Sequence, residues 1–232
     1  MNESSAVNEP LEPVLELGLM GGMFDPVHQG HLSIALTSLE KLQLNAIRLL
    51  PCGNPVHRSG LFASSRHRLA MLKLAVEDYP DIGIDDRECK SDAPSYTLKS
   101  LQNIKQEMPG ARLYFIMGQD AFNNFNSWYR WRDIFSLAHI VVAARPGYEL
   151  NPEKELQAEL NSRIVPSIEN LKQTENGKIL ITEYDYLDIS SSMVRLAIQR
   201  HKSLAGLVPE LVPEKVAQYI QTHKLYAREA DI

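Results

Sequence analysis

The feature that most constrains the fold is a regular alternation of short apolar runs with longer segments of helical periodicity. The apolar runs, which we predict to be buried strands, cover residues 14–20, 46–50, 113–117, 139–144 and 179–182. The predicted helices cover residues 64–78, 95–108, 191–201 and 213–223, and a further helix begins near Gly30. Strands that alternate with helices pair in parallel, with helices on both faces of one sheet.

This order predicts an α/β fold with a Rossmann-like, doubly wound parallel sheet and a small C-terminal helical extension. A length of 232 residues suits a single domain, which we expect to span 14–232. Within it we expect a catalytic core over 14–185 and a helical part over 186–232. The polar residues 1–13 are expected to form a disordered tail, and the polar stretch 147–178 a surface excursion.

Charge and composition exclude several classes of protein. The net charge is −5, whereas a nucleic-acid-binding protein is usually basic, so we expect no nucleic-acid partner. Cys52 and Cys89 lie far apart and match no zinc-ligand spacing. The acidic and polar residues 1–13 lack a basic segment followed by an apolar one, so we expect no signal peptide. No apolar run approaches the roughly 20 residues that cross a bilayer. We therefore expect a cytoplasmic protein with no membrane partner.

The loop after the first strand carries the most informative residues. It runs from Gly21 and Gly22, which let a backbone approach a ligand, to His28 and His31 at the start of the next helix. A helix start offers free N–H groups and partial positive charge, which suit a phosphate. Alone, such a histidine pair also fits surface chemistry or a zinc site. The nearest further zinc ligand would be His57, which has no cysteine or carboxylate at a suitable spacing.

The whole loop, Gly22-Met23-Phe24-Asp25-Pro26-Val27-His28-Gln29-Gly30-His31, resembles the motif of the nucleotidylyltransferase superfamily. The resemblance implies that His28 and His31 bind the phosphates of ATP and stabilise the transition state. It also implies that ATP contacts Gly21, Gly22, Phe24 and Gly30.

Further segments resemble nicotinate-nucleotide adenylyltransferases: Pro51–Arg58, Ser95–Leu101, Phe115–Asp120, Trp128–Trp131 and Arg145–Tyr148. The resemblance assigns ATP binding to Gly118 and Asp120, and it implies that the Trp128–Tyr129 pair stacks on a nicotinate ring. It assigns mononucleotide binding to His57, Arg58, Tyr96, Thr97, Trp128, Tyr129 and Arg145.

Simpler roles stay open for several of these residues. Ser95, Thr97 and Asp120 would also serve as helix N-caps. The basic loop that carries His57 and Arg58 would also suit a solvated surface. Arg58 stands where the family has a lysine, which keeps the charge but changes its geometry. Arg66 and Arg68, at the start of a helix, are expected to form surface pairs, although the resemblance also implies that a basic residue reaches the site from this position.

A second helix start, Asp188-Ile189-Ser190-Ser191-Ser192-Met193-Val194-Arg195, resembles the motif that completes the phosphate site in this family. Serine replaces the usual threonine at Ser192 and keeps the hydroxyl. The resemblance assigns ATP binding to Ser190, Ser191 and Ser192 and a catalytic role to Arg195. We therefore predict that the helix starts near His31 and Ser191 converge on one triphosphate.

Together these features predict transfer of the adenylyl group of ATP to nicotinate mononucleotide, with release of pyrophosphate and no covalent intermediate. Mg²⁺ is expected to bind mainly through the ATP phosphates, because the sequence has no dense carboxylate cluster and no direct metal ligands are assigned. The alternatives are an enzyme acting on nicotinamide mononucleotide or phosphopantetheine, and a nucleotide sensor without turnover. A tRNA-charging enzyme is disfavoured by the short, acidic chain. The sequence does not indicate an oligomeric state.

Overall fold

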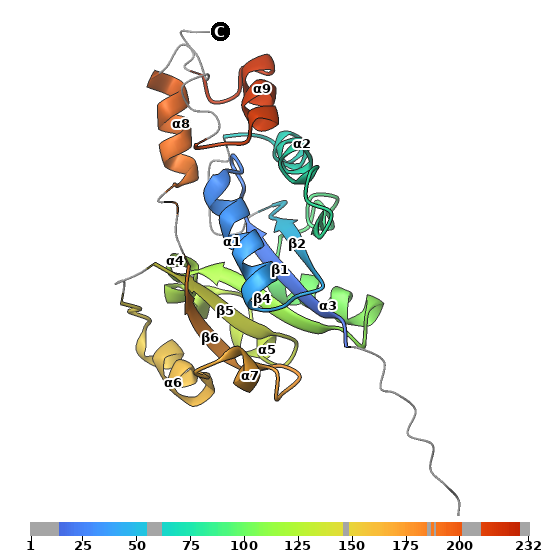
Figure 1. The fold of residues 1–232 in the computed structure, drawn as a ribbon, viewed down its shortest axis with the longest axis vertical. Coiled ribbons are helices and arrows are strands. Elements are labelled where there is room, and N and C mark those ends of the chain that lie inside the picture. The colour runs from blue at the N-terminus through green and yellow to red at the C-terminus, as the bar shows by residue number, and fades with distance from the viewer. Residues whose placement is uncertain are drawn as a thin grey trace, which may run out of the picture.

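A computed structural model describes residues 14–54, 62–145, 149–184, 187, 189–200 and 210–227 (Figure 1). The predicted tail at 1–13 and the predicted ligands His57 and Arg58 lie outside the described residues. No helix in the described part of the chain combines the length and the apolar character needed to cross a membrane.

Six parallel strands form one sheet in the order β3-β2-β1-β4-β5-β6. In chain order the strands are β1 (Glu16–Gly22), β2 (Ala46–Pro51), β3 (Ile82–Ile84), β4 (Arg112–Gly118), β5 (His139–Ala144) and β6 (Ile179–Glu183). The strand order reverses between β1 and β4, which places a ligand crevice at the carboxyl ends of these two strands. The predicted Rossmann-like parallel sheet is confirmed. Strand β3 was not predicted, because three residues at a sheet edge carry little periodic signal.

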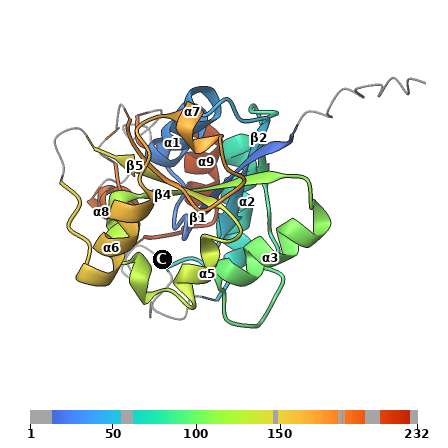
Figure 2. The same ribbon diagram turned by 90° about the horizontal axis from the view of Figure 1, so that it is seen from below.

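Helices cover both faces of the sheet (Figure 2). One face carries α1 (Gln29–Lys41), α2 (Ser65–Val76), α7 (Ile168–Leu171), α8 (Ser191–Arg200) and α9 (Glu214–Thr222). The opposite face carries α3 (Thr97–Glu107), α4 (Gln119–Asn123), the 3₁₀ helix η1 (Phe125–Ser127), α5 (Trp131–Ile134) and α6 (Lys154–Arg163). The helices predicted near 30, at 64–78, 95–108, 191–201 and 213–223 are therefore present, with ends shifted by a few residues.

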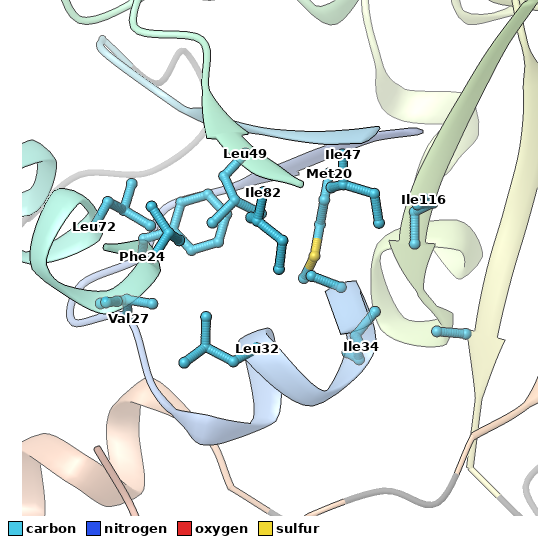
Figure 3. Packing of buried hydrophobic residues seen from close by; sticks show 14 of the residues in the cluster. Met20, Phe24, Val27, Leu32, Ile34, Ile47, Leu49, Leu72, Ile82 and Ile116 are labelled. Atoms are coloured by element: carbon cyan, nitrogen blue, oxygen red, sulfur yellow. The ribbon is translucent and has the colours of Figure 1, made fainter. Parts of the chain in front are cut away.

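Each strand sends alternate side chains to opposite faces, as a pleated strand must. On β4, Tyr114 and Ile116 join the apolar cluster under α1 and α2, while Leu113, Phe115 and Met117 join the cluster under α3 and α5. Figure 3 shows the first cluster, where side chains of α1 face those of β1, β2 and β4. Both clusters lie directly against the sheet, so the strand ends that carry the predicted site are rigidly held.

The prediction of a surface excursion over 147–178 is wrong for the two parts that form helices packed on the sheet. It contains α6 and α7, and the side chains of Leu156, Leu160 and Leu171 are buried. The polar residues of α6 face outward, whereas Leu156 and Leu160 share one inward face at a spacing of four residues. Packing on the sheet therefore orders a segment whose average composition resembles a loop.

Candidate active site

The loop after β1 turns sharply because its glycines make room for aromatic rings. A Cβ atom on Gly22 would lie 2.9 Å from the ring of Phe24, and one on Gly21 would lie 3.0 Å from that of Phe115. Phe24 is buried and has a φ of 49°, which is rare for a residue with a side chain. The glycines thus serve packing within the loop, and their contact with ATP stays a prediction.

His28 and His31 lie against each other at the start of α1, as predicted. Their ring centroids are 3.7 Å apart, and the ring of Phe24 packs edge-on against His31 at 4.9 Å. His28 is the N-cap residue and is buried, whereas His31 is half-buried in the first turn. A Cβ atom on Gly30 would lie 3.0 Å from Nδ1 of His28, so the close approach of this ring requires glycine.

Both histidines are held in the neutral form. Burial lowers the pKa of His28 to about 4. Burial and the neighbouring His28 lower the pKa of His31 well below its ordinary value of 6.5. The backbone N–H of His28 donates to Nδ1 of His31 at 3.3 Å, so the proton of the neutral His31 ring lies on Nε2. His31 therefore presents an N–H donor rather than a fixed positive charge.

The start of α8 meets this loop, so the two helix starts lie together as predicted, and their binding of one triphosphate stays a prediction. Ser191 donates its hydroxyl to the carbonyl of Pro26 at 3.0 Å, and Nη1 of Arg195 donates to the carbonyl of Asp25 at 2.6 Å. We call His28, His31, Ser191 and Arg195 the helix-start junction. Its four side chains come from two helices that lie more than 150 residues apart in sequence.

Two neighbouring serines support Arg195 and the start of α8. Nη2 of Arg195 donates to Oγ of Ser192 at 3.0 Å, and the Ser190 hydroxyl accepts the N–H of Met193 at 3.2 Å. The guanidinium of Arg195 also lies 4.2 Å from the centroid of the exposed Phe62 ring. Ser190 thus caps the helix, while Ser192 and Phe62 hold the arginine side chain in place.

Sequence reasoning missed Asp25, which lies at the centre of this loop. Its carboxylate is buried and accepts hydrogen bonds from the N–H groups of Phe62 and Ala63 at 2.8 and 3.2 Å and from the hydroxyl of Tyr226 at 2.7 Å. Three donors offset the cost of burying the carboxylate. The sequence motif includes Asp25, but no local pattern links it to Tyr226.

The prediction that Arg68 forms a surface pair is wrong. Arg68 is fully buried, and its guanidinium donates to the carbonyls of Met23 at 2.8 Å and Gly53 at 3.4 Å. These bonds tie the loop after β1 to the loop after β2. The sequence did not indicate this burial, because the two carbonyls that accept from Arg68 lie 45 and 15 residues away in the chain.

The start of α3 holds the loop after β2. The hydroxyl of Ser95 accepts hydrogen bonds from the N–H groups of Gly53 and Asn54, both at 3.1 Å, and the N–H of Ser95 donates to the carbonyl of Asn54 at 3.0 Å. The expectation that Ser95 or Thr97 caps the helix is wrong, because Tyr96 is the N-cap residue and Thr97 is the first helical residue. Ser95 is used to join two loops instead.

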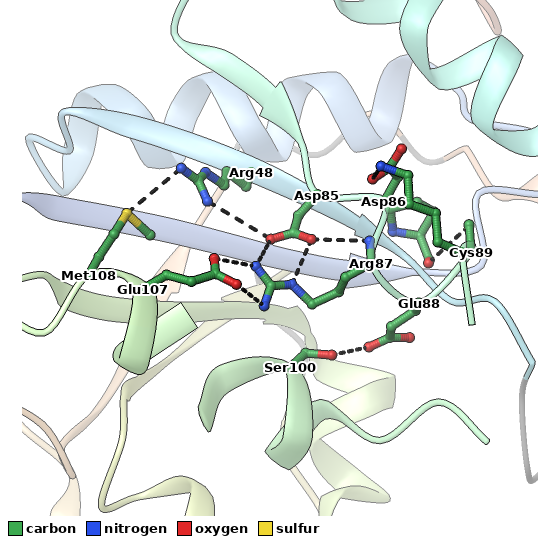
Figure 4. Close-up of polar contacts among 11 residues, drawn as sticks. Arg48, Asp85, Asp86, Arg87, Glu88, Cys89, Ser100, Glu107 and Met108 are labelled. Carbon is green, nitrogen blue, oxygen red and sulfur yellow. Dashed lines mark hydrogen bonds and ion pairs between the residues drawn. The ribbon is translucent and has the colours of Figure 1, made fainter. Parts of the chain in front are cut away.

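The segment before α3 also contacts α3 and the loop after β2 (Figure 4). Arg87 forms ion pairs with Asp85 at 2.7 Å and Glu107 at 2.9 Å, and the Ser100 hydroxyl donates to Glu88 at 2.6 Å. Burial raises the pKa of Glu88. A Cβ atom on Gly53 would lie only 1.9 Å from the carbonyl oxygen of Glu88, so these two backbones require glycine at their contact.

The aromatic residues predicted to bind the pyridine ring lie in two different environments. The rings of Tyr96 and Tyr129 lie 4.6 Å apart, and Tyr129 is 45% exposed; we call these two residues the tyrosine pair. Trp128 instead packs edge-on against Phe115 and Phe125 and is partly buried. Trp131, expected in the core, is buried there. The tyrosine pair, rather than Trp128, offers an exposed aromatic surface.

The ends of β4 and β5 are joined by a residue that sequence reasoning did not select. Gln119 is buried and accepts the N–H of Arg145 on Oε1 at 3.0 Å. Gly118 caps α4, and Asp120 lies exposed in its first turn, so the alternative that Asp120 is a helix cap is wrong, and its contact with ATP stays a prediction. Gly118, Asp120 and Arg145 therefore lie at the carboxyl ends of adjacent strands, where ligands of such sheets bind.

A cavity of about 580 Å³ lies away from these residues. It contains Arg132, Arg163 and Lys178 and includes none of the predicted site residues. Because Gly177 and Lys178 precede β6, this cavity lies toward the amino ends of the strands. Within the described ranges, no group of three or more His, Cys, Asp or Glu side chains is arranged to hold a metal ion.

Comparison with known proteins adds an independent result. Residues 19–197 match the model of the cytidylyltransferase-like family. The chain is 40% identical over 210 residues to a probable nicotinate-nucleotide adenylyltransferase of Pseudoalteromonas atlantica, covering 90% of this chain and 94% of that protein. It is 41% identical over 210 residues to the protein of the same name from Hahella chejuensis, with the same coverage.

A solved structure shares the fold. Nicotinic acid mononucleotide adenylyltransferase of Plasmodium falciparum, complexed with NaAD, superposes with a TM-score of 0.69 at 17% identity, covering 91% of this chain and 97% of that one. This likeness concerns the arrangement of the sheet and helices.

Proposed function

The chain belongs to the nicotinate-nucleotide adenylyltransferase family, and on that premise we propose that it transfers the adenylyl group of ATP to nicotinate mononucleotide. The products are nicotinate adenine dinucleotide and pyrophosphate, so the enzyme serves NAD biosynthesis. The observation that carries the proposal is the helix-start junction, where Ser191 and Arg195 of α8 bond to the loop that carries His28. We place the reaction in the cytoplasm, in keeping with the free thiols of Cys52 and Cys89.

The proposed chemistry is a single in-line displacement. A phosphate oxygen of the mononucleotide forms a bond to the α-phosphorus of ATP as the bond from this phosphorus to the leaving pyrophosphate breaks. A phosphate monoester is already a nucleophile, so no strong base and no covalent enzyme intermediate are needed. Catalysis then rests on positioning and on stabilising charge at the transferred phosphoryl group.

His28 and His31 supply this stabilisation as hydrogen-bond donors that are neutral before the phosphates bind. Their lowered pKa values keep both rings uncharged at neutral pH, and Nε2 of His31 carries the donor proton. A phosphoryl group that approaches them stabilises their protonated forms and raises their pKa values. The two histidines therefore favour positive charge only as negative charge builds on the phosphoryl group. In the empty site both rings are uncharged and do not repel each other.

The roles of the other site residues follow from where they lie in the fold. Arg195 and Ser191 hold the β- and γ-phosphates, since both already lie beside the loop of His28. The tyrosine pair receives the pyridine ring, because an exposed aromatic surface suits a flat aromatic acid. Arg145 and Asp120 face the nucleotides from the ends of β5 and β4.

Mg²⁺ is proposed to enter bound to the phosphates of ATP. The donor groups fit this mode: the buried carboxylate of Asp25 already accepts three hydrogen bonds, and the described residues hold no cluster that would replace the water shell of the ion. When bound, the ion neutralises phosphate charge. The protein residues hold and orient the phosphates around it.

Pyrophosphate release from ATP and Mg²⁺ tests the proposal, with nicotinate mononucleotide, nicotinamide mononucleotide or phosphopantetheine as acceptor. We expect the largest kcat/KM with nicotinate mononucleotide. A larger value with another acceptor would reassign the substrate. Saturable ATP binding without pyrophosphate release from any acceptor would support a nucleotide sensor instead.

A further inference from the structure

The side chain of Tyr226, near the end of the described chain, contacts the loop of the helix-start junction. Its hydroxyl donates to Oδ1 of Asp25 at 2.7 Å, across 201 residues of sequence. Both side chains are buried, with exposed fractions of 7% for Tyr226 and 4% for Asp25. Such a bond is strong because the acceptor is a carboxylate and water is excluded.

Asp25 links Tyr226 to the helix-start junction through both its backbone and its carboxylate. Its own carbonyl accepts the hydrogen bond from Arg195, and the next carbonyl, that of Pro26, accepts the one from Ser191. Its carboxylate also holds the N–H of Phe62, whose ring lies under the guanidinium of Arg195. Any shift of Asp25 therefore moves both the backbone and the aromatic partners of Arg195.

A second buried tyrosine shows what the same kind of bond does elsewhere. The hydroxyls of Tyr184 and Ser38 lie 2.8 Å apart, and the ring of Tyr184 belongs to the same apolar cluster as that of Tyr226. Ser38 lies within α1, seven residues beyond His31, and neither residue of this pair is predicted to contact a substrate. The two tyrosines differ chiefly in what their hydroxyls hold.

We propose that Tyr226 is a positioning residue for adenylyl transfer: its hydroxyl fixes Asp25 and thereby the two carbonyls that orient Arg195 and Ser191. This inference rests on the proposed function for its link to turnover. It assigns the C-terminal turn after α9 to the active site, although Tyr226 itself contacts no reacting atom.

Two matched variants test the assignment. Tyr226→Phe and Tyr184→Phe each remove one buried hydroxyl and keep the ring in the core. Phenylalanine tolerates the φ of 63° at position 226 no worse than tyrosine, so the backbone cost is unchanged. Each variant should lower the melting temperature by about 2–4 °C, as expected for one lost hydrogen bond.

Turnover should separate the two variants. With Tyr226→Phe we expect kcat to fall about tenfold, since a small misplacement of catalytic groups costs up to about 10²-fold. KM for nicotinate mononucleotide should stay within about twofold, because the tyrosine pair is not held by Asp25. Tyr184→Phe should keep wild-type kcat. Wild-type kcat in Tyr226→Phe, or an equal loss in both variants, would overturn the assignment.

Binding of a non-hydrolysable ATP analogue, measured by calorimetry, keeps this inference apart from the proposed function. Tyr226→Phe should weaken binding severalfold and Tyr184→Phe should leave it unchanged, whether or not the wild type turns over. Equal affinity in the two variants would contradict the role of Tyr226. Absence of turnover in a wild type that binds the analogue would contradict only the proposed function.

Discussion

The two halves of the candidate site are built differently. The helix-start junction is partly buried and cross-linked: the buried His28 lies against the half-buried His31, and Ser191 and Arg195 bond to backbone carbonyls. The tyrosine pair, on the other face of the sheet, is more open and includes the 45% exposed Tyr129. Besides Tyr129, the ring of Tyr96 has the ammonium group of Lys99 at 5.2 Å from its centroid.

This difference follows what each half must do in the proposed reaction. Charge develops at the transferred phosphoryl group, and fixed donors stabilise it best where water is excluded. The pyridine ring undergoes no chemistry, so it needs only a surface on which to stack. We therefore expect changes at the junction to lower kcat and changes on the tyrosine side to raise KM for the mononucleotide.

The largest expected effect comes from His31→Ala. Removing one donor to the transition state should lower kcat by about 10²–10³-fold, and steady-state pyrophosphate release measures it. His67→Ala is the matched control, because His67 contacts Tyr219 on α9 rather than the junction and should keep wild-type kcat. Wild-type turnover in a folded His31→Ala protein would remove the histidine pair from the mechanism.

Acid should destabilise the protein because buried histidines resist protonation. The pKa values of His28 and His139 are about 4 in the folded protein, lowered chiefly by burial, whereas the unfolded chain takes up these protons near pH 6.5. Their contribution is complete above pH 6.5 and declines as pH falls toward 4. At pH 5 the loss is on the order of 2 kcal/mol for each histidine.

Urea denaturation at pH 7 and pH 5 measures this loss. His28→Gln should reduce the difference between the two pH values, and His139→Gln, far from the junction, should reduce it similarly. A pH dependence that is the same in wild type and His28→Gln would mean that His28 is not buried and neutral, and it would weaken the contrast between the two halves.

Gly30→Ala tests the close packing of the junction. The new methyl group would lie 3.0 Å from Nδ1 of His28, so the His28 ring must shift slightly, whereas the carbonyl of Ile189 at 3.4 Å is an ordinary contact. We expect kcat to fall about tenfold. Gly110→Ala is the control, since a Cβ atom there would meet nothing within 4 Å. Equal kinetics of the two alanine variants would show that the His28 ring tolerates displacement.

Ser95→Ala should have the smallest effect, and it should act on the tyrosine side of the site. Loss of the hydroxyl leaves the N–H groups of Gly53 and Asn54 without this acceptor and loosens the loop after β2. We expect KM for the mononucleotide to rise about threefold to fivefold, equivalent to about 1 kcal/mol, with kcat nearly unchanged. Ser136→Ala, at an exposed serine of the α5 turn, is the control. A loss confined to kcat would contradict the expectation that changes at the junction lower kcat and changes on the tyrosine side raise KM.

The sequence predicts the framework well where a signal is local. Strands β1, β2, β4, β5 and β6 follow apolar runs, and the positions of His28, His31, Ser191 and Arg195 follow helix starts. The burial of Arg68 and the contact of Tyr226 with Asp25 depend on residues far away in the chain, so no periodicity indicates them. Helix α6 was missed because Leu156 and Leu160 are its buried side chains amid polar residues.

A crystal structure with a non-hydrolysable ATP analogue and nicotinate mononucleotide tests the central claim most directly. We predict phosphate oxygens within about 2.6–3.2 Å of Nε2 of His31 and of the Arg195 guanidinium, between the starts of α1 and α8. A triphosphate bound elsewhere, such as beside Arg132, Arg163 and Lys178 in the cavity near the amino end of β6, would contradict the account.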